Sequence, residues 1–192
     1  MSVVIHEVAH GYAALALGDT TAKYQGRLTL NPLSHLDPVG SVLVPLFGYF
    51  VGGFIIGWAC PVPFNPYNLR NQKWGEAIVA AAGPLANILI AVIFGVLLRL
   101  SMQNGFINEA FLNLASFVIL INITLAIFNL IPVPPLDGSK ILFAMLPYKW
   151  QGIRFAIERM GLLLVFVLIF FAWQFISPVI FGIFRLFTGV AF

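Results

Sequence analysis

The sequence predicts an all-α polytopic membrane protein, and three observations support this fold class. Of the 192 residues, 60% are hydrophobic and only 9% are charged, whereas a typical soluble domain has about 25% charged residues. The mean hydropathy is +0.97. Several apolar runs reach about 20 residues, which is the length of a helix that crosses the hydrocarbon core of a bilayer.

We expect a single domain over residues 1–192, because this length allows roughly four to six spans and little structure outside the bilayer. Its C-terminal helical segment, residues 158–190, contains Pro178, which can kink or divide it. The net charge of +3 bears on orientation in the membrane and gives no reason to expect a nucleic-acid partner. The single cysteine, Cys60, excludes an internal disulfide.

The N-terminal apolar segment, residues 1–17, is expected to form a helix that ends at Gly18 and Asp19. At a rise of 1.5 Å per residue it is about 25 Å long, a little shorter than a hydrocarbon core of about 30 Å. We therefore expect either a few more N-terminal residues in the natural protein or a helix that begins below the membrane surface.

The next two segments are less regular. Residues 19–38 are polar, with short alternation and β-branched residues, which predicts one or two short strands at the membrane surface. Such strands could accept an extended substrate by strand addition. Residues 39–60 are apolar but contain Pro45 and five glycines. This composition fits either a poor span or a re-entrant hairpin.

Two stronger spans follow a loop at 61–75 that is rich in proline and asparagine. They cover residues 76–100 and 110–131, and a short polar loop joins them. A short amphipathic helix is expected at 139–147, and a basic connector links it to the C-terminal segment.

The positive charges help to decide whether residues 39–60 cross the bilayer. If this segment crosses, the ten Lys and Arg residues divide four against six between the two faces. If it does not cross, eight lie on one face, and Arg99 and Arg185 lie on the other. The second division is a positive-inside pattern. We therefore favour a re-entrant or interfacial segment, with the 1–17 and 110–131 helices both ending on the cytoplasmic side.

The N-terminal helix carries an HExxH motif. His6 and His10 are one helical turn apart on the same face, the spacing at which two imidazoles can share a zinc ion. Glu7, beside them, is placed to deprotonate a water that zinc activates. The flanking residues are nearly all apolar. Three polar groups in a membrane helix are costly, which argues against a purely structural role.

A catalytic zinc site takes three protein ligands, and Asp137 is our candidate for the third. It lies just past the 110–131 span, after a proline-rich run, and the small Gly138 beside it allows close approach. A carboxylate near hydrocarbon is costly unless it is paired or bound to metal. The alternative is a simple turn residue before a glycine.

Three motifs, in this order along the chain, carry a family resemblance. They are HEVAH in an apolar helix, Gly-Pro-x-x-Asn at 83–87, and Asn-x-x-x-x-x-Pro-Leu-Asp-Gly at 129–138. Together they resemble the site-2 protease family of intramembrane zinc metalloproteases, peptidase family M50. The loops at 30–38 and 63–66 are similar to those of its compact bacterial and archaeal members. The resemblance covers a core of residues 1–147.

The resemblance implies a fold with a three-helix catalytic core, made by the motif helix and the 76–100 and 110–131 spans, and additional helices around it. It implies one zinc ion with His6, His10 and Asp137 as ligands. Glu7 would be the general base. The other implied site residues are Asn129, which would position or polarise the scissile carbonyl, and Asn87, which would hold the substrate strand.

Several of these residues have simpler interpretations. Asn129 could cap its helix or bridge two helices, and Asn87 could be an interhelical contact beside a kink. His35 fits a turn or interfacial position better than a site group. Cys60 fits a small apolar position at the end of a segment.

The function predicted from the sequence is a zinc-dependent intramembrane endopeptidase. It would hydrolyse peptide bonds in or near the transmembrane segments of membrane-protein substrates, in regulated intramembrane proteolysis. Its partners would be such a substrate and the lipid bilayer; an oligomer is left unassigned. We expect a multi-pass protein of the cell membrane, with the active site nearer the cytoplasmic side. The alternatives are a divalent-metal transporter, or a catalytically inactive relative that binds membrane proteins.

Overall fold

The computed structural model describes the chain except for residues 53–56, 58, 106–107, 148–149 and 190–192. The described residues form helices and irregular connections. The helices are α1 (Ser2–Ala16), α2 (Thr21–Tyr24), α3 (Val44–Gly52), α4 (Gly75–Gln103), α5 (Glu109–Leu130), α6 (Asp137–Met145), α7 (Gln151–Arg159) and α8 (Gly161–Thr188). Short 3-10 turns cover Pro32–His35 and Pro66–Asn68, and a π-helical turn over Pro38–Leu43 leads directly into α3.

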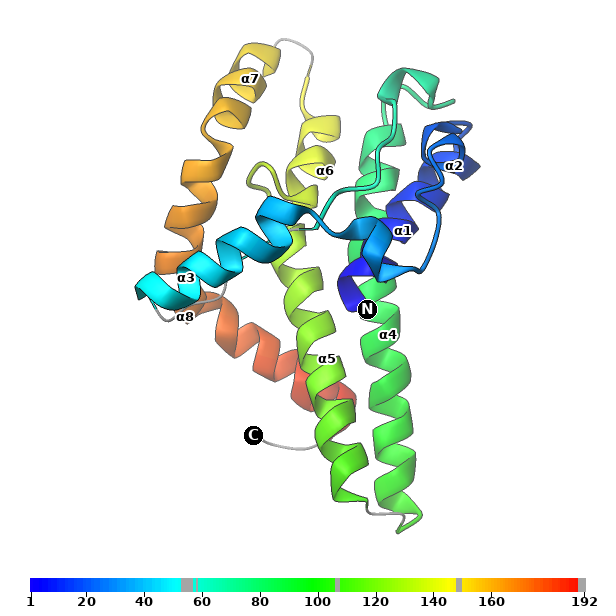
Figure 1. Ribbon diagram of the computed structural model, residues 1–192, viewed down its shortest axis with the longest axis vertical. Helices are drawn as coiled ribbons and strands as arrows, with labels where there is room; N and C mark the ends of the chain where they lie inside the picture. Colours follow the sequence, from blue (N-terminus) through cyan, green and yellow to red (C-terminus); the bar gives the residue numbers. More distant parts are fainter. Residues whose placement is uncertain (53–56, 58, 106–107, 148–149, 190–192) are drawn as a thin grey trace.

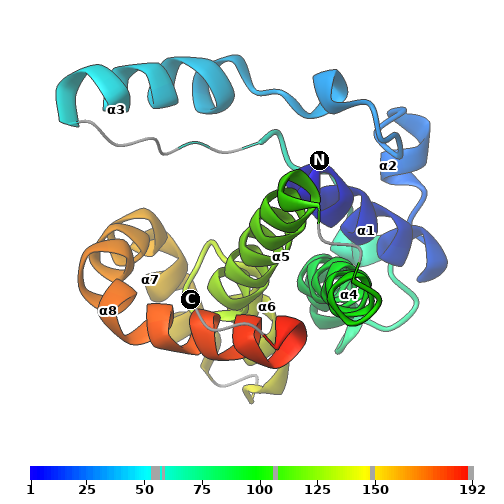
Figure 2. The ribbon, with the colours of Figure 1, turned by 90° about the horizontal axis from the view of Figure 1, so that it is seen from below.

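Helix α4 is the centre of the fold. The antiparallel α5 and the shorter α1 both pack against it (Figures 1 and 2). The three predicted core helices therefore form and pack together. Helices α4 and α5 each contain an 18-residue stretch with a mean hydropathy of 2.3, and both are long and apolar enough to cross a membrane. Together with the family resemblance, this indicates a membrane protein.

The C-terminal part of α8 packs across α5 and α4 (Figure 2). Small residues at the contact allow the helices to approach closely. On α4 these include Gly95, where a side chain would lie 3.0 Å from the carbonyl oxygen of Phe187. The buried residues of this core are Ala91, Leu98, Ala115, Ile119, Ile123, Ile180 and Phe184. The predicted basic connector before α8 is partly helical, since it forms α7.

The strands predicted at 19–38 are not formed. A helical turn, α2, and a 3-10 turn take their place, and the residues between these turns form no strand. The reason is local. Asp19 accepts hydrogen bonds from the backbone and hydroxyl of Thr21, and the Asn31 side chain accepts one from the backbone of Leu33. Such side-chain contacts favour turns over strands.

Asp19 also ties α1 to a later loop. Its carboxylate accepts hydrogen bonds from Asn65 N at 2.7 Å and from Asn68 Nδ2 at 2.9 Å, and the residue is 1% exposed. Burial raises the pKa of the Asp19 carboxyl, but the hydrogen bonds from Thr21, Asn68 and Asn65 outweigh burial and lower the pKa below its usual value. The charged form of Asp19 therefore stabilises the fold.

The segment between His35 and Cys60 leaves the helical core and returns to it. Helix α3 extends sideways, across the long axes of α4 and α5 (Figures 1 and 2). The ends of the segment meet, because Cys60 N donates a hydrogen bond to the carbonyl of His35 at 2.8 Å. The two ends of a single transmembrane span would instead be separated by about 30 Å. Part of this segment lies outside the described residues.

Candidate metal centre

The two histidines of the motif face the same side of α1. Their Nε2 atoms are 3.1 Å apart, and their rings meet edge to face with 4.7 Å between centroids. His6 is 5% exposed and His10 is 9% exposed. The i, i+4 spacing on a regular helix is sufficient to produce this pair.

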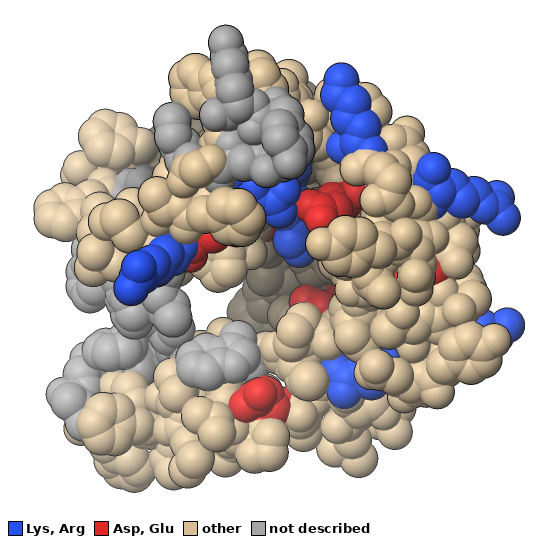
Figure 3. Space-filling model, turned by 90° about the horizontal axis from the view of Figure 1, so that it is seen from above, with Lys and Arg blue, Asp and Glu red and all other residues tan. Residues whose placement is uncertain are grey.

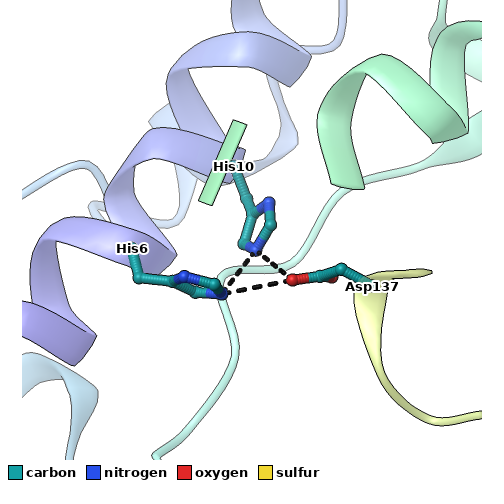
Figure 4. A group of neighbouring side chains, drawn as sticks. All are labelled: His6, His10 and Asp137. Atoms are coloured by element: carbon teal, nitrogen blue, oxygen red, sulfur yellow. Dashed lines mark hydrogen bonds and ion pairs between the residues drawn. The ribbon is translucent and has the colours of Figure 1, made fainter. Parts of the chain in front are cut away.

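Asp137 is the first residue of α6, and its carboxylate points toward the two histidine rings (Figure 4). Its Oδ2 atom lies 3.2 Å from Nε2 of both His6 and His10. Gly138 makes this approach possible. A side chain at Gly138 would lie 2.2 Å from the carbonyl oxygen of Leu130, so α6 could not begin so close to the end of α5.

The three polar atoms form a nearly equilateral triangle with edges of 3.1 to 3.2 Å. A tetrahedral zinc ion with ligand distances of about 2.0 to 2.1 Å has ligand atoms about 3.3 Å apart. The triangle is therefore close to one face of such a site. Within the described part of the chain, these residues form the group of His, Cys, Asp and Glu side chains suited to a metal.

The outer nitrogens of both rings have acceptors on α4. His10 Nδ1 lies 2.7 Å from the carbonyl oxygen of Val79, and His6 Nδ1 lies 3.0 Å from Oδ1 of Asn87. A carbonyl only accepts hydrogen bonds, so Nδ1 of His10 carries a proton. The same tautomer for His6 leaves both Nε2 lone pairs directed into the triangle. This arrangement is usual for metal-binding histidines.

Gly83 on α4 gives the two rings their space. A side chain there would have its first carbon 2.5 Å from Nε2 of His10 and 2.6 Å from Cε1 of His6. Any other residue would displace at least one imidazole. The Gly-Pro-x-x-Asn motif thus forms the wall behind the triangle, since Gly83 and Asn87 lie one helical turn apart on α4.

In front of the triangle lies a cavity of about 370 Å³. The polar side chains that line it are those of His6, Glu7, His10, Asn129, Asp137 and Lys140, and the apolar side is formed by Pro61, Val62, Pro63, Phe64 and Pro135. Of the six residues predicted for the site, five line this cavity. Asn87 is the exception, because it is 0% exposed and lies behind His6.

Glu7 is held in the cavity by a backbone contact that the sequence did not suggest. Its Oε2 atom accepts a hydrogen bond from Val62 N at 2.9 Å. The loop that contains Val62 is fixed on both sides: the Arg27 guanidinium donates to the carbonyl of Cys60, and Asn65 N donates to Asp19. The position of Glu7 therefore depends on residues 19–27 as well as on α1.

Asn129 lies near the end of α5, where it lines the cavity. Its Nδ2 donates to the carbonyl of Leu125 within the same helix at 2.9 Å. An amide nitrogen carries two hydrogens, so this contact uses one of them.

Comparison with known proteins identifies the family of this chain. The model of Peptidase family M50 matches residues 101–172. "Putative zinc metalloprotease YwhC" of Bacillus subtilis is 38% identical over 173 residues, which cover 88% of this chain and 76% of YwhC. The chain belongs to peptidase family M50.

Other relatives within family M50 are more distant. "Putative zinc metalloprotease MJ0611" of Methanocaldococcus jannaschii is 33% identical over 163 residues, which cover 83% of this chain and 71% of the relative. "Putative zinc metalloprotease Rip2" of Mycolicibacterium smegmatis is 31% identical over 172 residues, which cover 88% of this chain and 63% of Rip2. No solved structure gives a significant match. The family suggested by the sequence motifs is thus confirmed.

Proposed function

We propose that this chain is a zinc-dependent intramembrane endopeptidase that hydrolyses peptide bonds in or near the transmembrane segments of other membrane proteins. The observation that carries the proposal is the triangle of His6, His10 and Asp137, which shares one cavity with Glu7 in an apolar helical protein. The relatives named "Putative zinc metalloprotease" support zinc as the ion and proteolysis as the activity.

In this proposal His6 Nε2, His10 Nε2 and Asp137 Oδ2 hold one zinc ion. When bound, zinc supplies Lewis acidity, which polarises a scissile carbonyl and lowers the pKa of a water molecule. The residues behind the triangle keep the ligands in place, since Val79 and Asn87 accept the protons on the outer nitrogens of the two rings. Two neutral imidazoles and one carboxylate are a donor set that suits zinc.

Glu7 acts as the general base and then as the general acid. Its carboxylate takes a proton from the attacking water and passes it to the leaving nitrogen of the peptide. The hydrogen bond from Val62 N engages Oε2, which leaves Oε1 to carry the proton. The same contact prevents the side chain from rotating out of the cavity.

Asn129 contacts the substrate in this proposal. One hydrogen of its amide is used within α5, and the second can be donated to the scissile carbonyl oxygen. The buried position of Asn87 favours a role in orienting His6. A direct contact of Asn87 with substrate stays a prediction from the family resemblance, and it would require this side chain to become accessible.

We further propose a multi-pass topology in which residues 39–60 enter the membrane region and return on the same side. The contact between Cys60 and His35 supports this arrangement. The end of the molecule that carries α2 and α7 has Lys and Arg side chains projecting from it (Figure 3). From the positive-inside rule we infer that this end faces the cytoplasm and that the cavity lies nearer the cytoplasmic side.

The deciding experiment uses the purified chain in liposomes with a reporter that contains one transmembrane segment. We expect cleavage that a zinc chelator abolishes, that added Zn²⁺ restores, and that Glu7→Gln lacks. The reporter can be chosen by comparing membrane-protein fragments in cells that express wild type or Glu7→Gln. Undiminished cleavage by Glu7→Gln would exclude this mechanism. Movement of Zn²⁺ into the liposomes without any cleavage would instead favour a metal transporter.

A further inference from the structure

Lys140 on α6 is the cation among the described residues that line the cavity. It lies one helical turn after Asp137, and its Nζ is 3.7 Å from Oδ1 of Asp137. Its side chain is 37% exposed, so an ordinary surface lysine could occupy this position. The surroundings of its ammonium group indicate a more specific role.

The two oxygens of Asp137 have different partners. Oδ2 faces Nε2 of His6 and His10 at 3.2 Å, whereas Oδ1 faces the Lys140 ammonium. A carboxylate that is free to rotate can offer either oxygen, or both, to a metal ion. The ammonium group at Oδ1 fixes one orientation, in which Oδ2 alone enters the triangle.

A second contact holds the ammonium group in place. Lys140 Nζ lies 5.5 Å from the centroid of the Phe64 ring, which also lines the cavity. This distance is suitable for a cation–π interaction. Phe64 therefore keeps the lysine turned toward Asp137.

The carboxylates of the adjoining cavity do not compete for the lysine. Lys140 also borders an adjoining cavity that contains Glu76, Arg154 and Glu158. Both of those glutamates are paired with Arg154, at 3.4 Å for Glu76 and 2.8 Å for Glu158. Asp137 is thus the carboxylate that pairs with Lys140.

We propose that Lys140 is a positioning residue of the metal centre. Its ammonium group holds Oδ1 of Asp137, so that the carboxylate presents a single oxygen to the two imidazoles and the remaining space in the cavity stays open. This inference rests on the metal site proposed above. Residues that orient metal ligands in this way typically change the metal affinity by about 10-fold to 100-fold.

The test measures the metal site directly. The Zn²⁺ dissociation constant of the detergent-solubilised chain is determined by competition with a chromophoric chelator, for wild type, Lys140→Met, Lys140→Gln and Lys140→Arg. We expect Met and Gln to weaken binding about 10-fold. Arg keeps a positive charge and N–H donors, so we expect it to recover most of the affinity.

Two further measurements distinguish positioning from a general loss of structure. The visible absorption of the Co²⁺ form depends on the number and geometry of its ligands, so we expect the spectrum of Lys140→Met to change. In the liposome cleavage assay we expect kcat to fall with little change in KM. Lys140→Gln keeps a polar side chain, so it serves if Lys140→Met does not fold.

Lys73→Met is the matched control. Lys73 is an exposed lysine whose Nζ lies 5.4 Å from the ring of Trp74, and it borders a different cavity. Its removal deletes the same charge and a similar aromatic contact, so the Zn²⁺ affinity and the Co²⁺ spectrum should not change.

If wild type binds Zn²⁺ and cleaves while Lys140→Met behaves identically, the role of Lys140 is refuted and the proposed function stands. If wild type neither binds Zn²⁺ nor cleaves, both proposals fail.

Discussion

Asn87 on α4 accepts a hydrogen bond from the ring of His6 on α1, with 3.0 Å between Asn87 Oδ1 and His6 Nδ1. The amide is fully buried, and in this structure His6 separates it from the cavity. A residue whose type and motif suggest substrate binding thus contacts a candidate ligand instead. The two roles predict different defects when the side chain is removed.

Asn87→Ala should weaken Zn²⁺ binding by about 10-fold or more, because the His6 ring loses the contact that fixes its orientation. Chelator competition measures this directly. Asn122→Ala is the matched control, because Asn122 is also 0% exposed but its amide donates to Ser2 and Val118. A higher KM with unchanged Zn²⁺ affinity in Asn87→Ala would instead support the substrate role that the family resemblance implies.

Gly83→Ala should also reduce Zn²⁺ affinity, by at least 10-fold in the same chelator competition. Alanine is favoured over glycine in a helix by about 1 kcal/mol, so propensity alone would make this variant more stable. The new methyl group, however, would lie within 2.6 Å of both imidazoles. We therefore expect the metal site to be lost without a comparable gain in stability.

Gly182→Ala is the control for this substitution, because nothing lies within 4 Å of the position of a side chain there. It should leave Zn²⁺ binding unchanged. Wild-type affinity in Gly83→Ala would show that the histidine rings do not need the space behind them.

The stability of the folded protein depends on pH through the carboxyl group of Asp19. Its pKa is lowered in the folded protein, so its contribution to stability is complete above the unfolded-state value of about 3.9. That contribution is lost as the pH falls through the lower, folded-state pKa. Thermal unfolding in detergent between pH 3 and pH 7 should show wild type losing stability at the acid end of this range.

Asp19→Asn tests the same group at neutral pH. An amide nitrogen in place of one carboxylate oxygen would face the donors of Thr21, Asn65 or Asn68, which should cost about 2 to 3 kcal/mol. This difference from wild type should shrink below pH 4. Because Asn65 belongs to the loop that holds Glu7, we also expect a lower kcat. A constant difference across the pH range would contradict the role of the carboxylate.

The parts of the molecule that the sequence predicts well depend on spacing along one helix or on apolar length. The 1–17, 76–100 and 110–131 segments are long apolar runs, and the i, i+4 histidines need only a helix to face the same way. Asp137 could be selected because a carboxylate beside a membrane span requires a partner. The triangle consists of the two histidines and the aspartate that were predicted in these two ways.

The remaining features depend on contacts between distant segments that leave no local pattern. The partner of Glu7 is the backbone N–H of Val62, and a main-chain donor has no residue signature. Asn87 and His6 are 81 positions apart. The strands predicted at 19–38 failed because the side chains of Asp19 and Asn31 bond to nearby backbone groups and stabilise turns.

Asn129 offers the clearest separation between binding the metal and acting on the substrate. It lines the cavity, but its amide contacts the carbonyl of Leu125 and none of the three candidate ligands. Asn129→Ala should therefore leave Zn²⁺ affinity unchanged. Removing a donor to a developing oxyanion lowers kcat by about 100-fold or more, which is the effect we expect on cleavage. Asn129→Asp, which keeps the shape but loses the donor, should behave in the same way. If Asn129 only caps α5, both variants will instead lower the unfolding temperature and leave kcat near that of wild type.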